Sequence, residues 1–575
     1  MQLCRLFMIL GALATLALLT LAAASLPWQL LAVAAAAVAV RNSKKDRGLF
    51  SGGTAAWADA GSLERAGMIG GGGLCVGVVA PARPSLWRAA RGLLSSKIPS
   101  RQACEDFAHA LRNLKRHPVE VRLNHVIHTA VVAPTGSGKG VSLILPFLLE
   151  CKESCVVIDP KGENARVTAD ARRAMGHQVV VLDPFKIVTD APDTLNVLDA
   201  VCTDSPTALD DCRAIANQLV QRTGSEPDPH WNDAAESMIT ALIAVTLFLD
   251  GKDRSLQTVR RLLTDTERRA TMLRHMAAVG DWDGMLARAC LQVLNYEGKE
   301  LAGILSTANR HMNFLDTPAV AESTRASSFG MAELLKRMRT LYLVLPPQYL
   351  DSHSGLLRLW VGASIRACMH NGLQERNKVH FVLDEAASLG KLDILRHAVD
   401  KLRGYGARLQ FYFQSLAQVK SVWPDGQDQT FLSNVTLVTF GSQDKETCEY
   451  VSAMLGKETI VVESEGTNAG TSASRNTTDA GGNLGTSRGG SRNYSQQARE
   501  LLQPDEVRNL SPLTAITFTP GAGGPIATTL RRYYEPRPRH RPIRTTLRIW
   551  AAGLGLLGLS STALWVWVTL TFHHR

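Results

Sequence analysis

Residues 133–140 have the composition of a phosphate-binding loop. The sequence APTGSGKG stands between a predicted strand that ends near Val132 and a predicted apolar helix over 141–149. Glycines let backbone amides turn toward phosphate groups, and the start of the helix adds partial positive charge. A lysine at this place reaches the β- and γ-phosphates. The predicted nucleotide-binding residues are Pro134, Thr135, Gly136, Ser137, Gly138, Lys139, Gly140 and Val141.

Two positions depart from the usual form of such a loop, GxxxxGK[ST]. Ala133 replaces the first glycine, and Gly140 replaces the hydroxyl residue that normally binds Mg²⁺. Ser142 offers a hydroxyl two residues later. The sequence therefore predicts nucleotide binding but leaves this part of the Mg²⁺ shell open.

A second candidate motif is an apolar strand over 381–383 followed by two carboxylates, Asp384 and Glu385. In phosphate-loop motors the first acid holds the metal, usually through water, and the second polarises the attacking water. A strand that ends in Asp-Glu is common by itself. Together with Lys139 it predicts a hydrolytic site, with Asp384 on the metal and Glu385 as the general base.

A third strand, over 409–413, ends in Gln414. A glutamine there can contact the γ-phosphate and report its loss, although the same residue could simply cap the strand. Arg403 and Arg408 precede this strand. An arginine in this place could reach the nucleotide of a neighbouring subunit as a finger.

The elements that position these residues are short, β-branched runs with turn residues at their ends, as buried parallel strands have. Helical patterns lie between the runs, which indicates an α/β class with a mostly parallel sheet. The predicted strands cover 131–132, 155–158, 179–182, 341–345, 381–383, 409–413 and 435–440.

The strand pattern stops between 196 and 338, where helical periodicity replaces it, so we expect an all-α domain inserted into the α/β one. Residues 464–495 are rich in Gly, Ser, Thr and Asn and predict a mobile linker or loop. The nucleotide-binding domain then has a first part over 123–195 and a second part over 339–534, which contains this flexible segment.

Both ends of the chain carry apolar runs. Residues 6–26 and 30–40 predict an N-terminal transmembrane hairpin within 1–40, and 550–572 predict a C-terminal transmembrane helix. A cleaved signal peptide is the alternative at the N-terminus, and a buried core helix at the C-terminus. Juxtamembrane segments cover 41–122 and 535–549.

The formal net charge is +11, and nine of these charges lie in two clusters beside the apolar runs, +3 over 41–47 and +6 over 531–548. Such clusters mark the cytoplasmic side of a membrane protein, so basicity alone is weak evidence for DNA binding. A further basic stretch over 83–122 could meet DNA or lipid headgroups, or be a solvated surface. We expect the region between the spans to be cytoplasmic.

The ten cysteines show no paired framework. The closest two, Cys151 and Cys155, lack CxxC spacing and neighbouring histidines in the sequence. We interpret them as reduced thiols.

The motifs together resemble one family, the TraG-like coupling proteins of type IV secretion systems, which are related to FtsK-type and RecA-like ring motors. The resemblance runs from about residue 53 to 534. The matching phrases are APTGSGKGV (133–141), DPKGE (159–163), HWNDAAESMITALI (230–243), LSTANRHMNFLDTPAVAEST (305–324), LYLVLPPQYLDSH (341–353), FVLDEAASLGKL (381–392), FQSLAQ (413–418) and ARELLQPDEVRNL (498–510).

The resemblance implies a RecA-like P-loop ATPase that binds ATP and Mg²⁺, sits in the bacterial inner membrane and forms a homohexamer. Its partners would be type IV secretion channel components and, for conjugation, a relaxase with single-stranded DNA. Lys139, Asp384, Glu385, Arg403 and Gln414 match the family's Walker A, Walker B, arginine-finger and sensor positions. The C-terminal span departs from the soluble tail of many members.

Three functions remain open at this point. The chain could couple conjugative DNA to the channel, recruit protein effectors with the same ATPase, or act as a nucleotide-binding scaffold that does not hydrolyse. Gly140 motivates the scaffold, whereas Glu385 and Gln414 count against it.

Overall fold

The computed structural model describes residues 53–79, 118–474 and 483–535, except 225, 280, 335, 375 and 376. The predicted membrane segments over 1–40 and 550–572 lie outside the described residues, as do most of 41–122 and all but the first residue of 535–549. No helix in the described part is long and apolar enough to cross a membrane.

An 11-stranded sheet runs through the body of the molecule, in the order β2-β1-β13-β12-β9-β3-β8-β7-β4-β6-β5. Seven neighbouring strands are parallel, and they are the seven that the sequence predicts. The α/β class with a mostly parallel sheet is therefore confirmed. These strands are β3 (Thr129–Val132), β4 (Ser154–Asp159), β5 (Gln178–Leu182), β6 (Arg339–Val344), β7 (Val379–Leu383), β8 (Ala407–Phe413) and β9 (Thr436–Phe440).

Four antiparallel strands extend the sheet beyond β9, and the sequence patterns did not predict them. Each has at most six residues, and so short a run gives little periodicity to recognise. They are β1 (Leu74–Val79), β2 (Val119–Leu123), β12 (Thr514–Phe518) and β13 (Ile526–Thr529).

Helices cover both faces of the sheet because successive strand side chains point to opposite faces. Val131 packs in one core with α5 (Leu145–Glu150) and α6 (Glu163–Ala174), while Ala130 and Val132 pack in the other. The second core contains side chains of α14 (Ser354–His370), α15 (Asp393–Lys401), α16 (Leu416–Val422) and α17 (Gln427–Asn434).

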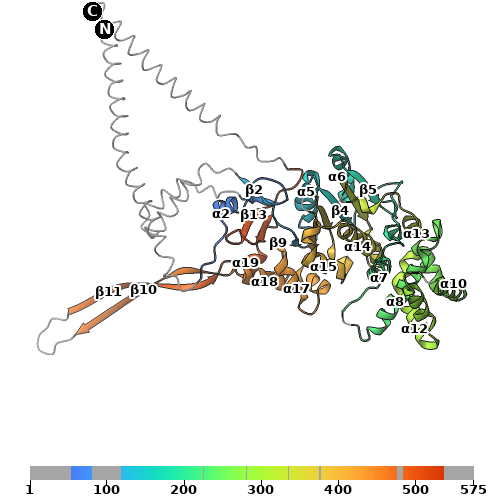
Figure 1. Ribbon diagram of the computed structural model, residues 1–575. Coiled ribbons are helices and arrows are strands. Elements are labelled where there is room, and N and C mark those ends of the chain that lie inside the picture. The colour runs from blue at the N-terminus through green and yellow to red at the C-terminus, as the bar shows by residue number, and fades with distance from the viewer. Residues whose placement is uncertain are drawn as a thin grey trace, which may run out of the picture.

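The described residues between 196 and 338 form helices and loops without a strand. They gather at the end of the molecule that lies away from β10 and β11 (Figure 1). The helices are α7 (Ala208–Leu219), α8 (His230–Thr246), α9 (Leu256–Thr264), α10 (Thr266–Val279), α11 (Met285–Leu294), α12 (Gly298–Met312) and α13 (Pro318–Arg325).

A long two-stranded ribbon stands where the sequence predicts a linker or loop. Strands β10 (Lys457–Ser474) and β11 (Asn483–Glu500) pair antiparallel from Lys457↔Glu500 to Ser474↔Asn483. The ribbon projects from the body (Figure 1). Its composition is typical of linkers, but backbone pairing between two strands needs few apolar side chains. Helices α18 (Lys445–Leu455) and α19 (Pro504–Arg508) flank it in the sequence.

Candidate nucleotide-binding site

The loop between β3 and α5 has the backbone of a phosphate-binding loop. Gly136 and Gly138 have φ angles of 80° and 96°, a left-handed region that costs glycine little. A single π-helical turn, Gly140–Ile144, follows, in which the Leu145 N–H donates to the Gly140 carbonyl. Pro146 favours this wider turn because it has no N–H for an α-helical bond.

Lys139 folds back along this loop. Its Nζ donates to the Ala133 carbonyl at 2.5 Å and to the Pro134 carbonyl at 3.4 Å. Burial lowers the pKa of Lys139, while the nearby Asp384 and Glu385 carboxylates act to raise it. The lysine and the two predicted acids therefore belong to one electrostatic group.

The acids meet because β7 and β4 are parallel neighbours, so their carboxyl ends share one edge of the sheet. Asp384 follows β7, and Asp159 is the last residue of β4. Desolvation by burial raises the pKa of each carboxyl to about 6, and Lys139 partly opposes this at Asp384. A cation placed between such acids would offset their cost of burial.

Glu385 is held by two glutamines beyond the end of the neighbouring strand β8, Gln414 just after it and Gln418 on α16. Gln414 donates through Nε2 to both Glu385 carboxylate oxygens, at 3.2 and 3.0 Å, and Gln418 Nε2 lies 3.3 Å from Oε1. Glu385 also has a φ of 66°, which is strained for a residue with a side chain. The structure thus joins the predicted base and the predicted sensor directly.

The oxygen donors here suit Mg²⁺, which prefers carboxylates and retained water. Asp384, with the buried Asp159 carboxylate nearby, is the residue that would hold the ion. Ser142 lines a pocket together with residues of β1 and β2 and with Arg531 and Tyr533, which follow β13. It therefore lies beside the C-terminal end of the described chain, and nothing places its hydroxyl with the acids.

Arg403 does not join this group. It lies in the 3₁₀ turn Leu402–Tyr405 before β8, whereas Gln414 follows the other end of that strand. A seven-residue strand is about 20 Å long, and the Arg403 side chain is exposed. Within one chain, Arg403 is thus at the opposite edge of the sheet from Lys139.

An arginine that the sequence analysis did not assign to the site lies on the loop itself. A Cβ added at Gly138 would fall 1.5 Å from Arg532 Nη1, so the guanidinium rests on this glycine. Residues 530–535, which we call the strap, follow β13 and are fixed by the bond from Tyr533 N–H to the Val141 carbonyl, 2.9 Å long. Arg531 adds an ion pair with Glu120 at 2.9 Å.

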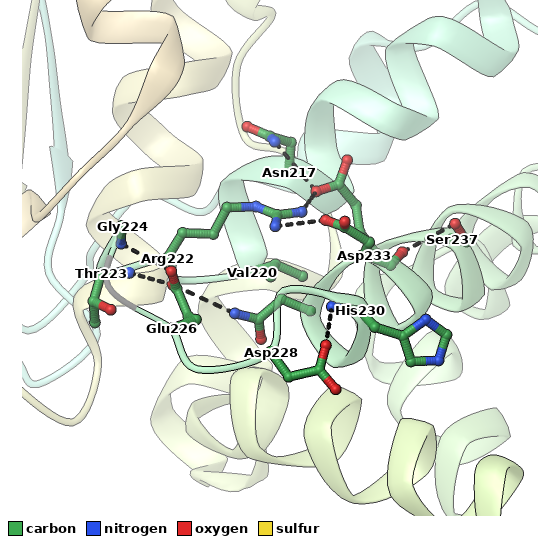
Figure 2. A network of polar contacts seen from close by, with 12 residues as sticks. Asn217, Val220, Arg222, Thr223, Gly224, Glu226, Asp228, His230, Asp233 and Ser237 are labelled. Atoms are coloured by element: carbon green, nitrogen blue, oxygen red, sulfur yellow. Dashed lines mark hydrogen bonds and ion pairs between the residues drawn. The ribbon is translucent and has the colours of Figure 1, made fainter.

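Two arginines connect the segment after Glu385 with the all-α region. Arg358 of α14 is buried and donates to the carbonyls of Gln218, Val220, Leu389 and Lys391. Arg222 pairs with Asp233 at 2.6 Å (Figure 2) and with Glu236 at 2.8 Å, and its backbone forms a bridge with Lys391.

The loop that carries Arg222 is ordered by carboxylates. Figure 2 shows Glu226 accepting from the Thr223 and Gly224 amides, at 2.5 and 2.9 Å, and Asp228 accepting from the His230 amide at 3.1 Å. This loop leads into α8, where the phrase HWNDAAESMITALI begins. The segment that follows Glu385 is therefore joined to α8 through the bridge between Lys391 and Arg222 and the ion pairs of Arg222.

The parallel sheet, the glycine-rich loop and the acids at strand ends define a P-loop nucleotide-binding protein. The chain matches the family described as Type IV secretory system Conjugative DNA transfer over residues 56–546, and it belongs to that family.

Known relatives agree with this assignment. The conjugal transfer protein TraG of Rhizobium radiobacter is 29% identical over 403 residues, which are 68% of this chain and 60% of TraG. The protein VirD4 of Agrobacterium fabrum is 26% identical over 424 residues, 72% of this chain and 60% of VirD4. The chain thus spans about three fifths of the length of these relatives.

Solved structures share the fold. The bacterial conjugative coupling protein TrwBdeltaN70, in complex with sulphate, has a TM-score of 0.54 at 17% identity and covers 72% of this chain and 87% of its own. TrwB has also been solved with ADP and Mg²⁺, with a TM-score of 0.52 at 17% identity and the same coverage. At this identity the likeness extends to the fold alone.

Proposed function

We propose that this chain is an ATP-hydrolysing coupling protein that passes conjugative DNA, with its attached relaxase, to a type IV secretion channel. The observation that carries the proposal is the Glu385 carboxylate, held by Gln414 and Gln418 beside Asp384 and Lys139. A scaffold that binds nucleotide without hydrolysing it needs no water-activating carboxylate hydrogen-bonded to a sensor glutamine. Family membership supports the DNA substrate.

In this proposal, Lys139 and the loop amides bind the β- and γ-phosphates of ATP, and Asp384 holds Mg²⁺. The ion would neutralise phosphate charge that develops during hydrolysis. Glu385 orients the attacking water. Gln414 keeps or breaks its hydrogen bonds with Glu385 according to whether the γ-phosphate is present. The contacts of Arg358 and Arg222 then carry this change to α8.

Arg403 would contact the nucleotide that is bound to a neighbouring subunit of a homohexamer. Its exposed position at the far edge of the sheet supports a role between chains, since it cannot meet Lys139 of its own chain. We further propose that the ATPase is cytoplasmic and anchored in the inner membrane by the apolar runs at both ends of the sequence.

The test is ATP hydrolysis by the full-length protein in detergent, with and without single-stranded DNA, for the wild type and for Glu385→Gln. We expect DNA to stimulate hydrolysis and the variant to lose at least 100-fold in kcat, as for removal of a general base. Plasmid transfer should also be lost with Lys139→Ala at normal expression. Hydrolysis that DNA does not affect would favour protein effectors, and no hydrolysis at all would favour the scaffold.

A further inference from the structure

Three side chains of metal-binding type converge at the edge of the sheet opposite Lys139. Cys151 follows the end of α5, Glu153 precedes β4, and His380 is the second residue of β7. One ligand atom from each, a sulfur, an oxygen and a nitrogen, lies within 4.8 Å of the other two. The Glu153 Oε2 to His380 Nε2 distance is 2.5 Å.

The sheet and one buried arginine bring these residues together. Strands β4 and β7 pair with Cys155 opposite His380, so the start of β4 lies beside the imidazole. Arg172 of α6 is fully buried and donates to the backbone carbonyls of Cys151 and Glu153, which fixes the turn between α5 and β4. The histidine that the sequence does not show beside Cys151 is therefore supplied by a strand distant in the chain.

The ligand atoms indicate the class of metal. Thiolate, imidazole and carboxylate together suit Zn²⁺ and related transition metals, whereas Mg²⁺ and Ca²⁺ prefer oxygen alone. Ligand atoms around a tetrahedral zinc lie about 3–4 Å apart, given bonds of about 2.0–2.3 Å. The present spacing needs only small movements of three side chains to reach this geometry.

The cluster also opens onto space for a further ligand. All three residues line a cavity of about 550 Å³, together with Lys378, Arg408 and residues of β2 and β3. A zinc site with three protein ligands keeps its fourth position for water or an exchangeable ligand. The cavity provides that position without a fourth side chain.

We propose that Cys151, Glu153 and His380 form a binding site for Zn²⁺, separate from the nucleotide site, with the fourth coordination position toward this cavity. The ion would replace the proton shared by Glu153 and His380 and would join the end of α5 to β4 and β7. The π-helical turn that begins at Gly140 leads into α5, Asp159 ends β4, and Asp384 follows β7. The site would thereby brace the sheet beneath the phosphate-binding loop.

The test is metal binding by the full-length protein in detergent, after chelation and removal of the chelator. Equilibrium dialysis against Zn²⁺ with elemental analysis should give one ion per chain. Cys151→Ser and His380→Asn should each weaken binding at least tenfold, because loss of even an outer-shell partner costs about 10- to 100-fold in affinity, while Cys202→Ser, at an exposed cysteine outside the cluster, should bind like the wild type. Equal binding by the wild type and Cys151→Ser would overturn the proposal.

A spectroscopic measurement removes the dependence on variant folding. Co²⁺ bound by a thiolate in tetrahedral geometry gives intense visible bands and a sulfur-to-metal charge-transfer band in the near ultraviolet. We expect both with wild-type protein and competition by Zn²⁺. A wild-type spectrum without the charge-transfer band would exclude Cys151 as a ligand and would overturn the site as proposed.

Discussion

Glu385 is fixed more by its neighbours than by its own backbone, because its φ of 66° is unfavourable and its carboxylate accepts from Gln414 and Gln418. We expect Gln414→Ala to lower kcat for ATP about 10- to 100-fold, since the carboxylate loses its main orienting donor. The KM for ATP should change little. Steady-state kinetics with Gln429→Ala, an exposed glutamine on α17, as control would check this.

Arg532 places a guanidinium on the phosphate-binding loop at Gly138. An arginine beside phosphate forms charge-assisted hydrogen bonds, each about 1.5–3 kcal/mol in favourable cases. We expect Arg532→Ala to weaken ATP binding about tenfold, measured by calorimetry in the Glu385→Gln background. Arg531→Ala is the matched control because this neighbour pairs with Glu120 instead. Equal losses in both variants would mean that only strap attachment matters.

At the scale of the elements, His128 joins three strands at the start of β3. Its Nδ1 accepts from the Leu409 N–H at 3.2 Å, and its carbonyl accepts from the Thr436 N–H at 2.9 Å. Burial, with smaller contributions from the positive charges of Arg408 and Arg403, lowers the pKa of His128 to about 3. The folded protein therefore holds this imidazole neutral.

This shift predicts a loss of stability in acid. Between about pH 6.5, the pKa of an unfolded histidine, and pH 3, the unfolded chain binds one proton more than the folded chain. The free energy of unfolding should thus fall as pH decreases, by about 2 kcal/mol at pH 5 from this group. Denaturant unfolding of His128→Asn should show a smaller decrease between pH 7 and 5, while His397→Asn, exposed on α15, should match the wild type.

Arg222 links the segment after Glu385 to α8 through Lys391, Asp233 and Glu236. We expect Arg222→Ala to keep basal ATP hydrolysis within about twofold but to reduce plasmid transfer at least tenfold. The reason is that hydrolysis would no longer be coupled to movement of α8. Arg213→Ala is the control, since Arg213 pairs with Asp210 of the same helix, α7. Parallel loss of hydrolysis and transfer would contradict this coupling.

Among the strands, the buried parallel ones were those that the sequence could predict. Strands such as β4 and β7 contain uninterrupted apolar runs, over 155–158 and 381–383, which are visible without tertiary information. The antiparallel strands depend on partners far along the chain. The ribbon of β10 and β11 was missed because glycine is uncommon in strands and a Gly- and Ser-rich composition is typical of linkers.

The residues of the candidate site were likewise predictable only where local sequence patterns reveal them. The grouping of Lys139, Asp384, Glu385 and Gln414 was predictable because each follows a parallel strand, and the carboxyl ends of such strands share one edge of the sheet. Arg532 was assigned to membrane orientation, since no local pattern links the strap to the loop. The cluster of Cys151 with His380 requires the order β4-β7 in the sheet, which spacing does not reveal.

For the whole molecule, the distance of Arg403 from Lys139 makes the proposed active site a property of two chains. We expect Arg403→Ala to lower kcat about 1000-fold, as for other arginine fingers. Mixed with wild type, it should inhibit more than dilution predicts, because each variant chain disables a neighbour. Titrated mixtures with Lys401→Ala, an exposed lysine on α15, as control would check this, and a strictly proportional loss would contradict a shared site.

The strap couples nucleotide binding at the phosphate-binding loop to mechanical tension on the chain that follows the strap. Tyr533 is bonded to Val141, and Arg532 lies on Gly138, so the phosphate-binding loop and the chain leading to residue 536 share contacts. A ligand that shifts these contacts changes the work needed to detach the strap. By reciprocity, a pull on the chain beyond residue 535 changes the affinity for that ligand by the same free energy.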